Sequence, residues 1–284
     1  MAAGHSPTLR SRRLRAHLRK LREEHGLTLA QAAKQVDWTG AKLSRIENGQ
    51  RGAHPNDVRA LADVYGVTGE EREALITLAR EARQRGWWQP YGSALPYGFA
   101  TYVGLESEAS RIATYEPELV PGLMQTEDYA RAQMRAAPIS EPEQEIDKRI
   151  AVRMTRQRRF TEPNPPVFWV ILNDAAVRRQ VGGRKTLRDQ LDRLIELAQA
   201  PTVTLQVLPF TAGAHPAGHG PFTILGFPEP EDLDVAYVEY LTGRVFLEEP
   251  EEMSRYTLVL NHLRARAFSA DESIAHVRGV VRDL

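Results

Sequence analysis

The sequence predicts an α+β protein, made of an all-α N-terminal domain with five helices and a C-terminal α+β (or α/β) domain with a small mixed sheet flanked by helices. Two patterns lead to this prediction. Over residues 9–86 apolar residues recur three and four positions apart without any strand pattern, whereas residues 105–284 contain both helical and strand patterns. The length of 284 residues also suits two compact units better than one small module.

Five predicted helices in residues 9–86 follow a flexible tail over residues 1–8. Thr8 can cap the first helix, whose leucine stripe is spaced i, i+4 and i+7 from Leu14. Each later helix begins where a capping residue, a proline or a glycine precedes an apolar repeat, and these starts are Thr28, Thr39, Pro55 and Gly69. We expect the fifth helix to run to about Arg85 and to stop at Gly86.

Residues 87–104 have a different composition, with two prolines, three glycines, six aromatic residues and no charge. A solvated linker would be polar, so this segment is expected to pack against something. We interpret it as an ordered hinge, with Trp87 and Trp88 between the two domains. The alternative is that both tryptophans fill the core of the second domain.

Residues 105–284 are predicted to begin with helices, continue with strands and end with a helix. The continuous apolar run Val167–Leu172, which follows two prolines, is typical of a strand inside a sheet. The other predicted strands are Thr202–Leu208, Pro221–Phe227, Val235–Tyr240 and Val245–Leu247. The predicted helices are Glu106–Tyr115, Thr126–Ala136, Glu143–Phe160, Leu187–Gln199 and Pro250–Phe268, the last being the final element.

The formal net charge of zero conceals an unequal distribution of charge. Residues 1–86 carry 16 Lys and Arg against 10 Asp and Glu, while residues 87–284 carry 21 against 27. A basic first part indicates an anionic partner at that end. No apolar run approaches the roughly 18–20 residues of a membrane-spanning helix, and the N-terminus lacks an apolar signal segment, so we expect a cytoplasmic protein without membrane contact. The absence of cysteine excludes disulfides and thiolate metal sites.

The most informative stretch is Thr28–Gly49, TLAQAAKQVDWTGAKLSRIENG. Two short capped helices joined by a tight turn are typical of a helix-turn-helix, whose second helix enters the DNA major groove. Leu43 and Ile46 would anchor that helix. Its exposed side would carry the candidate DNA-contacting residues Thr39, Gly40, Ala41, Lys42, Ser44 and Arg45. The alternative is an ordinary solvated face on a helical domain that does not bind DNA.

The string GLTLAQAAKQVDWTGAKLSRIENGQR resembles the xenobiotic-response-element (XRE) family of regulators, which are similar to the lambda and 434 phage repressors. The resemblance implies a lambda-repressor-like fold and binding to double-stranded operator DNA, usually as a homodimer. It also implies a structural ion pair between Arg22 and Glu47. Asn48 matches a phosphate-binding asparagine of the family, and Arg51 follows in the same loop.

The sequence departs from this family at the start of each helix of the motif. Leu29 occupies a position where relatives often have a phosphate-binding glutamine, and Gly40 and Ala41 replace longer polar side chains. Specificity would therefore depend on Lys42, Ser44, Arg45 and DNA shape. Basic residues of the first helix can contact backbone phosphates, which we expect for one or two of Arg10, Arg12, Arg13, Arg15 and Arg19, with Arg19 as our candidate.

The rest of the chain also resembles known sequences. The strings RGWWQPYG, LESEASRIATYEPELVPGLMQTEDYARA, VILNDAAVRRQVGG and LQVLPFTAGAHPAGHGPFTIL look like an uncharacterised C-terminal domain that accompanies this kind of helix-turn-helix in actinobacterial regulators. The resemblance implies a regulatory context but no known ligand. Such genes often neighbour one for a small protein, which implies a possible protein partner; an unknown small-molecule effector is the other possibility.

Other candidates in the second domain have simpler explanations. A basic cluster at Lys148, Arg149, Arg153, Arg156, Arg158 and Arg159 is predicted to be a solvated helix face, with contact to DNA or to an acidic ligand as the alternative. His215 and His219 lie in a Gly/Pro loop without an obvious third ligand, so we expect no metal there. Asp174, after the apolar strand, is expected to cap the following turn. The acidic stretch from Glu229 to Glu252 is most simply a solvated surface.

No catalytic motif is recognisable, and we expect neither a catalytic residue nor a cofactor. The predicted function is a sequence-specific DNA-binding transcriptional regulator, in which residues 9–86 bind DNA and residues 105–284 sense a signal, dimerise or bind a partner. The alternative is an antitoxin-like protein that captures a small neighbour-encoded protein and autoregulates its operon. An undetected active site in the second domain is a weaker third hypothesis.

Overall fold

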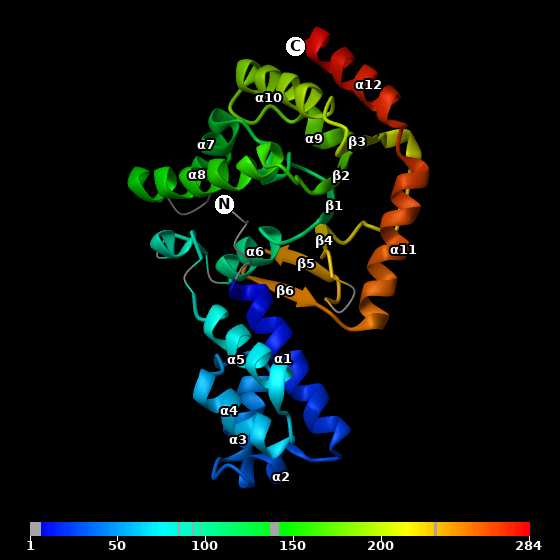
Figure 1. Ribbon diagram of the computed structural model, residues 1–284. Helices are drawn as coiled ribbons and strands as arrows, with labels where there is room; N and C mark the ends of the chain where they lie inside the picture. The colour runs from blue at the N-terminus through cyan, green and yellow to red at the C-terminus, as the bar shows by residue number, and fades with distance from the viewer. Residues whose placement is uncertain (1–6, 85, 93, 97, 137–141, 230–231) are drawn as a thin grey trace. The chain divides into compact units, whose positions relative to one another are not determined.

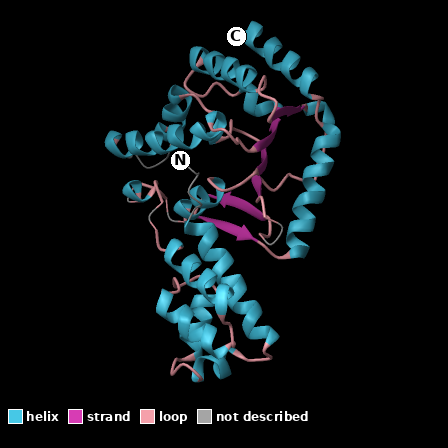
Figure 2. Ribbon diagram, viewed as in Figure 1, coloured by secondary structure: helices cyan, strands magenta, loops and turns pink. Residues whose placement is uncertain are grey.

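The computed structural model describes residues 7–84, 86–92, 94–96, 98–136, 142–229 and 232–284. Contacts divide the chain into two compact units, Met1–Gln89 and Pro90–Leu284, called unit 1 and unit 2 below. Predicted tail residues 1–6 and Arg85 lie outside the described residues. Figure 1 shows the elements of both units, and Figure 2 shows that the ribbon of unit 1 contains helices and loops whereas the strands belong to unit 2.

Unit 1 is all-α over its described residues, as predicted. Its five helices are α1 (Pro7–Glu24), α2 (Leu29–Lys34), α3 (Gly40–Glu47), α4 (Pro55–Val64) and α5 (Gly69–Glu81). Every helix contributes to one apolar core, whose fully buried members include Leu18, Ala33, Leu43, Leu61 and Ile76.

Two helix ends of unit 1 differ from the prediction. Helix α1 begins at Pro7, so Pro7 and Thr8 are helical and do not belong to the tail. Proline is favoured in the first turn because that turn has no use for its missing N–H group. Helix α5 ends at Glu81, with Ala82 as its C-cap, and is shorter than the predicted helix to Arg85.

Unit 2 contains a mixed sheet of six strands in the order β3-β2-β1-β4-β5-β6. The three strands β1, β2 and β3 are parallel, and β4, β5 and β6 extend the sheet from β1 in antiparallel fashion. The bounds are Arg111–Glu116 for β1, Val167–Asn173 for β2, Val203–Leu208 for β3, Phe222–Gly226 for β4, Val235–Tyr240 for β5 and Gly243–Leu247 for β6. The prediction of a small mixed sheet in an α+β domain is confirmed.

Helical segments connect the parallel strands, because such strands cannot be joined by a tight turn. The α-helices are α6 (Phe99–Glu106), α7 (Glu127–Arg135), α8 (Glu143–Gln157), α9 (Asp174–Arg178), α10 (Arg184–Leu197), α11 (Pro250–Arg266) and α12 (Ala270–Asp283). The 3₁₀ helices are η1 (Gln89–Tyr91), η2 (Gly122–Met124), η3 (Arg158–Thr161) and η4 (Phe210–Ala212).

The sheet of unit 2 is covered on both faces. Helix α11 lies along one face, whereas α7, α8 and α10 lie on the other (Figure 1). The α11 face carries a buried cluster that includes Tyr115, Ile171, Ile224 and Leu263. Side chains alternate along a strand, so the neighbours of these residues point to the opposite face.

Three predictions about unit 2 are wrong. The segment predicted as a helix over Glu106–Tyr115 contains the end of α6 and most of β1, which pairs with β2 on one side and β4 on the other. Residues 99–104, predicted to be hinge, form most of α6, whose residues Tyr102, Val103 and Leu105 are buried. Helix α12 follows the helix predicted to be the final element.

None of the helices in the described residues combines the length and apolar composition needed to span a membrane.

Candidate nucleic-acid interface

Helices α2 and α3 form a compact pair because local hydrogen bonds fix both of their N-termini. The Oγ1 atom of Thr28 accepts a hydrogen bond from the N–H of Gln31, whose side chain accepts one from the N–H of Thr28. At the second helix, the hydroxyl of Thr39 accepts from the N–H of Lys42 at 3.2 Å. These caps satisfy backbone donors that the first helical turn leaves free.

The turn between the two helices depends on an unusual backbone conformation. Asp37 has a φ of 55°, the one positive value at a non-glycine residue of the described chain. Aspartate tolerates this left-handed region better than most residues. The following N–H, of Trp38, donates to the carbonyl of Ala33 at 2.9 Å and so closes the turn.

One face of α3 is anchored in the core of unit 1 and the other is accessible. Leu43 and Ile46 are buried, as is Glu47. Among the predicted DNA-contacting residues, Thr39, Ala41 and Arg45 are exposed, whereas Gly40, Lys42 and Ser44 are only partly exposed. The Nε atom of Arg45 donates to the carbonyl of Ala41 at 3.2 Å, which holds the side chain along the helix surface.

Lys42 is not a freely extended side chain. Its ammonium donates to Oδ1 of Asp57 at 2.9 Å and lies 3.3 Å from the centroid of a Trp38 ring. Asp57 belongs to the first turn of α4, where its other oxygen accepts from the N–H of His54. Partial burial opposes ionisation of Asp57, but the hydrogen bonds from Lys42 and His54 outweigh it and lower its pKa below the ordinary value.

Arg22 of α1 and Glu47 of α3 form a buried two-point ion pair. The Nε and Nη2 atoms of Arg22 donate to the two oxygens of Glu47 at 2.8 and 2.9 Å. The Nη1 atom donates to the carbonyl of Leu27 at 2.8 Å. The pair therefore ties α3 to α1 and to the loop that leads into α2, and its hydrogen bonds raise the pKa of Arg22.

The loop after α3 presents further polar groups. Asn48 is exposed and its Nδ2 donates to Oγ of Ser44 at 3.1 Å, while the exposed Arg51 donates its N–H to the carbonyl of Arg45 at 3.0 Å. Gly49 has a φ of 71°, and a Cβ built there would lie 1.9 Å from a guanidinium nitrogen of Arg15. Arg15 of α1 therefore lies directly against this loop.

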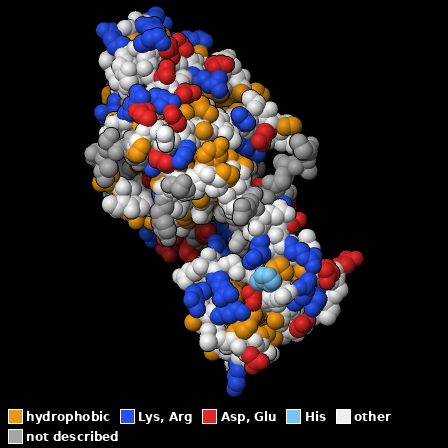
Figure 3. Space-filling model, turned by 90° about the vertical axis from the view of Figure 1, so that its left-hand side faces the viewer, with side chains coloured by type: hydrophobic (Ala, Val, Ile, Leu, Met, Phe, Trp, Pro, Cys, Tyr) orange, Lys and Arg blue, Asp and Glu red, His pale blue; other side chains and the backbone are white. Residues whose placement is uncertain are grey.

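The surface charge of unit 1 is mixed. Figure 3 shows Lys and Arg side chains in several groups on the visible face of unit 1, with carboxylates between them. Arg19, the candidate for phosphate contact on α1, is exposed and pairs with Glu23 at 3.0 Å. A surface pair of this kind is weak and can exchange for a phosphate.

Two contributors to this surface, Trp38 and Asp57, were not among the candidate residues predicted from the sequence. A signal for Asp57 was present, because HPND places an acid at the N3 position after a proline at N1, where it forms a capping box with His54. Nothing in the sequence indicates that Lys42 reaches this carboxylate from another helix.

The other candidate residues lie at separate places. Trp87 and Trp88 belong to unit 1, with ring centroids 5.8 Å apart, Trp88 buried and Trp87 exposed. His215 contacts Tyr115, its Nε2 lying 3.4 Å from the tyrosine hydroxyl. Asn173 and not Asp174 caps α9, whereas the buried Asp174 accepts hydrogen bonds from Arg178 and His276. Among the described residues no group of three or more His, Cys, Asp or Glu is arranged to hold a metal ion.

The prediction of a solvated face for the second basic cluster is wrong for four of its arginines. Arg159 is mostly shielded from solvent and donates to the carbonyl of Ala109 at 2.9 Å. Arg156 is buried and makes a two-point ion pair with Glu106 of α6 at 2.7 and 2.6 Å. Arg153 lines a cavity of unit 2, and Arg149 donates to the carbonyl of Ala94 at 2.7 Å. Periodicity alone could not detect this, because an arginine beside an apolar stripe faces inward only where another element supplies an acceptor.

Two family models match the chain. A helix-turn-helix domain of the XRE-like type matches residues 13–75, which include α2, α3 and α4, and domains of this class bind DNA. A domain of unknown function (DUF5753) matches residues 99–279 and so covers most of unit 2. No curated protein and no solved structure matches the chain. Since the second match covers more than half of its length, the chain belongs to the DUF5753 family, with a helix-turn-helix domain preceding the domain that defines that family.

Proposed function

We propose that this protein is a sequence-specific DNA-binding transcriptional regulator, in which unit 1 binds an operator and unit 2 has a regulatory role. The observation that carries the proposal is the exposed face of α3 within a matched helix-turn-helix domain. Thr39, Ala41 and Arg45 lie on that face, and the Nη atoms of Arg45 donate to no described residue. A guanidinium so placed is suited to the two acceptors of a guanine edge.

Phosphate contacts would orient this helix in the groove. Asn48 and Arg51 follow α3 in an exposed loop, and Arg19 lies on α1 in a weak surface pair. Lys42, Ser44 and Gly40 are less accessible and have a smaller part in the proposal. Lys42 supports the position of α3 through Asp57, and its stem and ammonium reach DNA only if that pair opens.

The experiment is a genome-wide map of DNA bound by the full chain, followed by fluorescence anisotropy on the mapped site. Arg45→Ala is expected to weaken binding to the mapped site about 10- to 100-fold and to relax its specificity, because a base contact is worth roughly 1–3 kcal/mol. Asn48→Ala and Arg51→Ala should weaken binding to all sequences alike. The matched control is Arg80→Ala, which removes an exposed arginine from α5.

Salt dependence supplies an independent readout. Each phosphate contact should lower log K by about 0.9 per unit of log salt concentration, so Arg51→Ala should reduce the slope by about one. The proposal fails if no sequence binds better than bulk DNA, or if affinity does not depend on salt. It also fails if Arg45→Ala behaves like Arg80→Ala.

The proposal includes a cytoplasmic homodimer on two half-sites spaced about one helical turn apart, the usual arrangement for this motif. Sedimentation with and without operator tests the dimer, since a monomer bound to a single half-site contradicts it. Co-purification with a small protein encoded beside this gene would instead favour the antitoxin-like alternative.

We also propose that the segment around Trp87 and Trp88 transmits the state of unit 2 to unit 1. Trp87 is exposed, so Trp87→Ala tests this with little risk to folding, and Trp88→Phe keeps an aromatic ring at the buried position. Operator affinity unchanged by both substitutions would remove this part of the proposal.

A further inference from the structure

Unit 2 contains a cavity of about 240 Å³, partly open to solvent, on the face of the sheet opposite α11. Its walls come from β1, β4 and β5, from α6 and α8, and from the segment that includes η2. Pockets for drug-sized ligands span roughly 300–1,000 Å³, so this volume suits one small metabolite.

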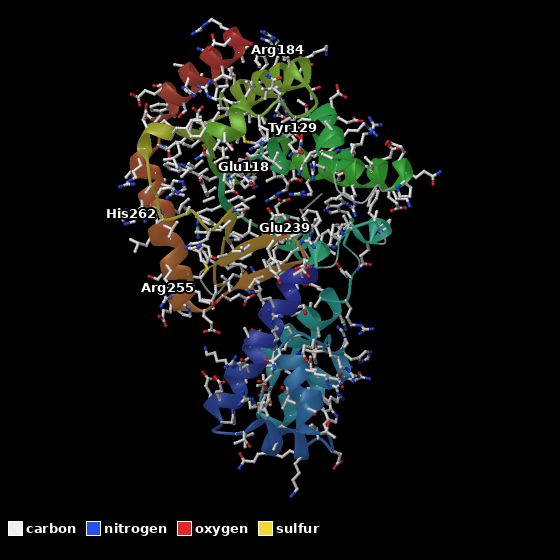
Figure 4. The ribbon with its side chains drawn as sticks, turned by 180° about the vertical axis from the view of Figure 1, so that it is seen from behind. Glu118, Tyr129, Arg184, Glu239, Arg255 and His262 are labelled. Atoms are coloured by element: carbon white, nitrogen blue, oxygen red, sulfur yellow. The ribbon has the colours of Figure 1, made fainter. Side chains whose placement is uncertain are left out.

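The floor of the cavity changes from apolar to acidic along the strands. The pairing places Ile112, Leu225 and Val235 in one row across the sheet. The next row on the same face contains Thr114, Thr223 and Tyr237, and the hydroxyls of the two threonines lie 3.0 Å apart. One step further come Glu116 on β1 and Glu239 on β5, both of which line the cavity. In Figure 4 Glu239 is labelled.

The two floor carboxyls differ in their partners. Glu239 accepts hydrogen bonds from Nη2 of Arg244 at 2.6 Å and from the hydroxyl of Tyr237 at 2.8 Å. Glu116 forms no hydrogen bond or ion pair with any described residue. Burial, and then the nearby Glu239, raise the pKa of Glu116 to about 8, and Arg153 opposes this only in part.

The roof of the cavity contains a similar contrast between two arginines of α8. Arg156 is neutralised by Glu106 and packs against the rings of Phe99 and Tyr102. Arg153 instead donates through one nitrogen to the neutral side-chain oxygens of Gln125 and Gln133, the latter at 2.8 Å.

Arg153 thus has donors left over. Its Nε and Nη2 atoms make no hydrogen bond to any described residue, and no described carboxylate pairs with it. Burial, and then the neighbouring Arg156, lower the pKa of Arg153 to about 10. The two amides fix the direction of the guanidinium without supplying the negative charge that it lacks.

The lining of the cavity therefore contains one acid and one base that form no ion pair with any described residue. Burial disfavours the ionised form of each group, and a ligand that carries both charges would offset this cost for both. A ligand with one charge leaves the other wall unsatisfied. The apolar floor beside Ile112 and Phe168 can accept a hydrocarbon part.

We propose that this cavity binds a small zwitterion of the amino-acid class, with its ammonium at Glu116, its carboxylate at Arg153 and an apolar side chain over Ile112 and Phe168. Gln125 and Gln133 act as positioning residues for Arg153. The site is independent of the DNA-binding proposal, because all of its residues belong to unit 2.

The test is isothermal titration calorimetry of the full chain, without DNA, against the standard L-amino acids. At least one apolar amino acid is expected to bind with a Kd below roughly 1 mM. The analogue without the carboxylate and the analogue without the amine should each bind the unmodified chain at least about tenfold more weakly. The amino acid itself should bind Glu116→Gln and Arg153→Gln at least about tenfold more weakly than the unmodified chain. Glu118→Gln and Arg158→Gln are matched controls, because both residues are exposed and neither lines the cavity.

Proton release on binding provides a second test, which uses the unmodified chain and so does not depend on how well a cavity variant folds. At neutral pH Glu116 is protonated in most molecules of the protein, and an ammonium placed beside it displaces that proton. Titrations of the unmodified chain in buffers of different ionisation enthalpy should therefore report proton release. Proton uptake, binding that needs only the carboxylate, binding unaffected by Glu116→Gln, or no binding up to roughly 10 mM would each overturn the proposal.

Discussion

The ammonium of Lys42 lies 2.9 Å from the carboxylate of Asp57 and joins α3 to α4. Both side chains are mostly shielded from solvent, at 21% and 14% exposure. A residue that pattern alone placed on the accessible face of the second helix of the motif therefore supports that helix from its side.

Replacing Asp57 with asparagine should destabilise unit 1. The change removes the ion pair with Lys42 and weakens the capping box of α4, which together should cost about 1–2 kcal/mol. Because the pKa of Asp57 is lowered in the folded chain, its contribution is present above the unfolded pKa and is lost as pH falls through the lower folded value. Urea unfolding at neutral and acidic pH measures both effects. Asp63→Asn, at an exposed pair with Arg72, is the control and should change stability by less than about 0.5 kcal/mol.

Breaking the pair between Arg22 and Glu47 should be more costly. Glu47→Ala leaves a buried guanidinium without its carboxylate, and we expect a loss of about 3–5 kcal/mol in the free energy of unfolding. The double substitution Arg22→Met with Glu47→Leu should recover most of that loss, because no unpaired charge remains. Chemical denaturation measures these values. Glu24→Ala, which removes an exposed partner of Lys20, should be nearly silent, and an equally small effect of Glu47→Ala would contradict the ion-pair argument.

Gly49 and Gly52 offer a matched pair of glycines in one loop. Gly49→Ala should lower stability by about 1–2 kcal/mol, because a left-handed backbone disfavours a side chain and its Cβ collides with Arg15. Gly52→Ala should be neutral, since its φ is not positive and no atom lies within 4 Å of the added Cβ. The variant Gly49→Ala combined with Arg15→Ala separates the two causes, since only the collision is relieved. Equal melting temperatures for the two single variants would refute this reading of the loop.

The stability of unit 2 should depend on Glu116 in a defined pH window. Its pKa is raised from an ordinary 4.5 to about 8, so the folded chain retains a proton that the unfolded chain loses. The free energy of unfolding therefore falls as pH rises between those two values. Compared with that of Glu116→Gln, the free energy of unfolding of the unmodified chain is highest at the acidic end of this range. The charged groups that face Glu116 are Glu239, which adds to the effect, and Arg153, which reduces it. Melting temperatures of the unmodified chain and of Glu116→Gln at about pH 5 and about pH 8 test this, with Glu118→Gln expected to follow the unmodified chain.

Helical periodicity and capping residues were sufficient to predict unit 1. Thr28 and Thr39 cap α2 and α3, Pro55 begins α4, and Leu43 and Ile46 are buried as their spacing requires. Such signals are local, because a cap or an amphipathic repeat acts within a few residues of chain. The turn at Asp37 is equally local, and its left-handed residue is of a type that tolerates that conformation.

Unit 2 was harder to predict, because its elements depend on partners distant in sequence. Residues Arg111–Glu116 are a short stretch of mixed polar and apolar residues. They form a strand because β2 pairs with one of its edges and β4 with the other. Helix α12 packs on β3 and α10, which precede it by many residues. A short stretch of sequence does not show which distant strand or helix it will pack against.

The sequence by itself determined the two-part organisation, the five helices of unit 1 and the motif that α2 and α3 form, because these follow from local propensity and spacing. Only the tertiary structure decided which charged side chains form ion pairs and which do not. It paired Lys42 with Asp57 and Arg156 with Glu106, and it placed Glu116 and Arg153 in the lining of one cavity without an ion-pair partner among the described residues. The physical reason is that the cost of a charge depends on burial and on the nearest opposite charge, and both are set by residues that the fold brings together.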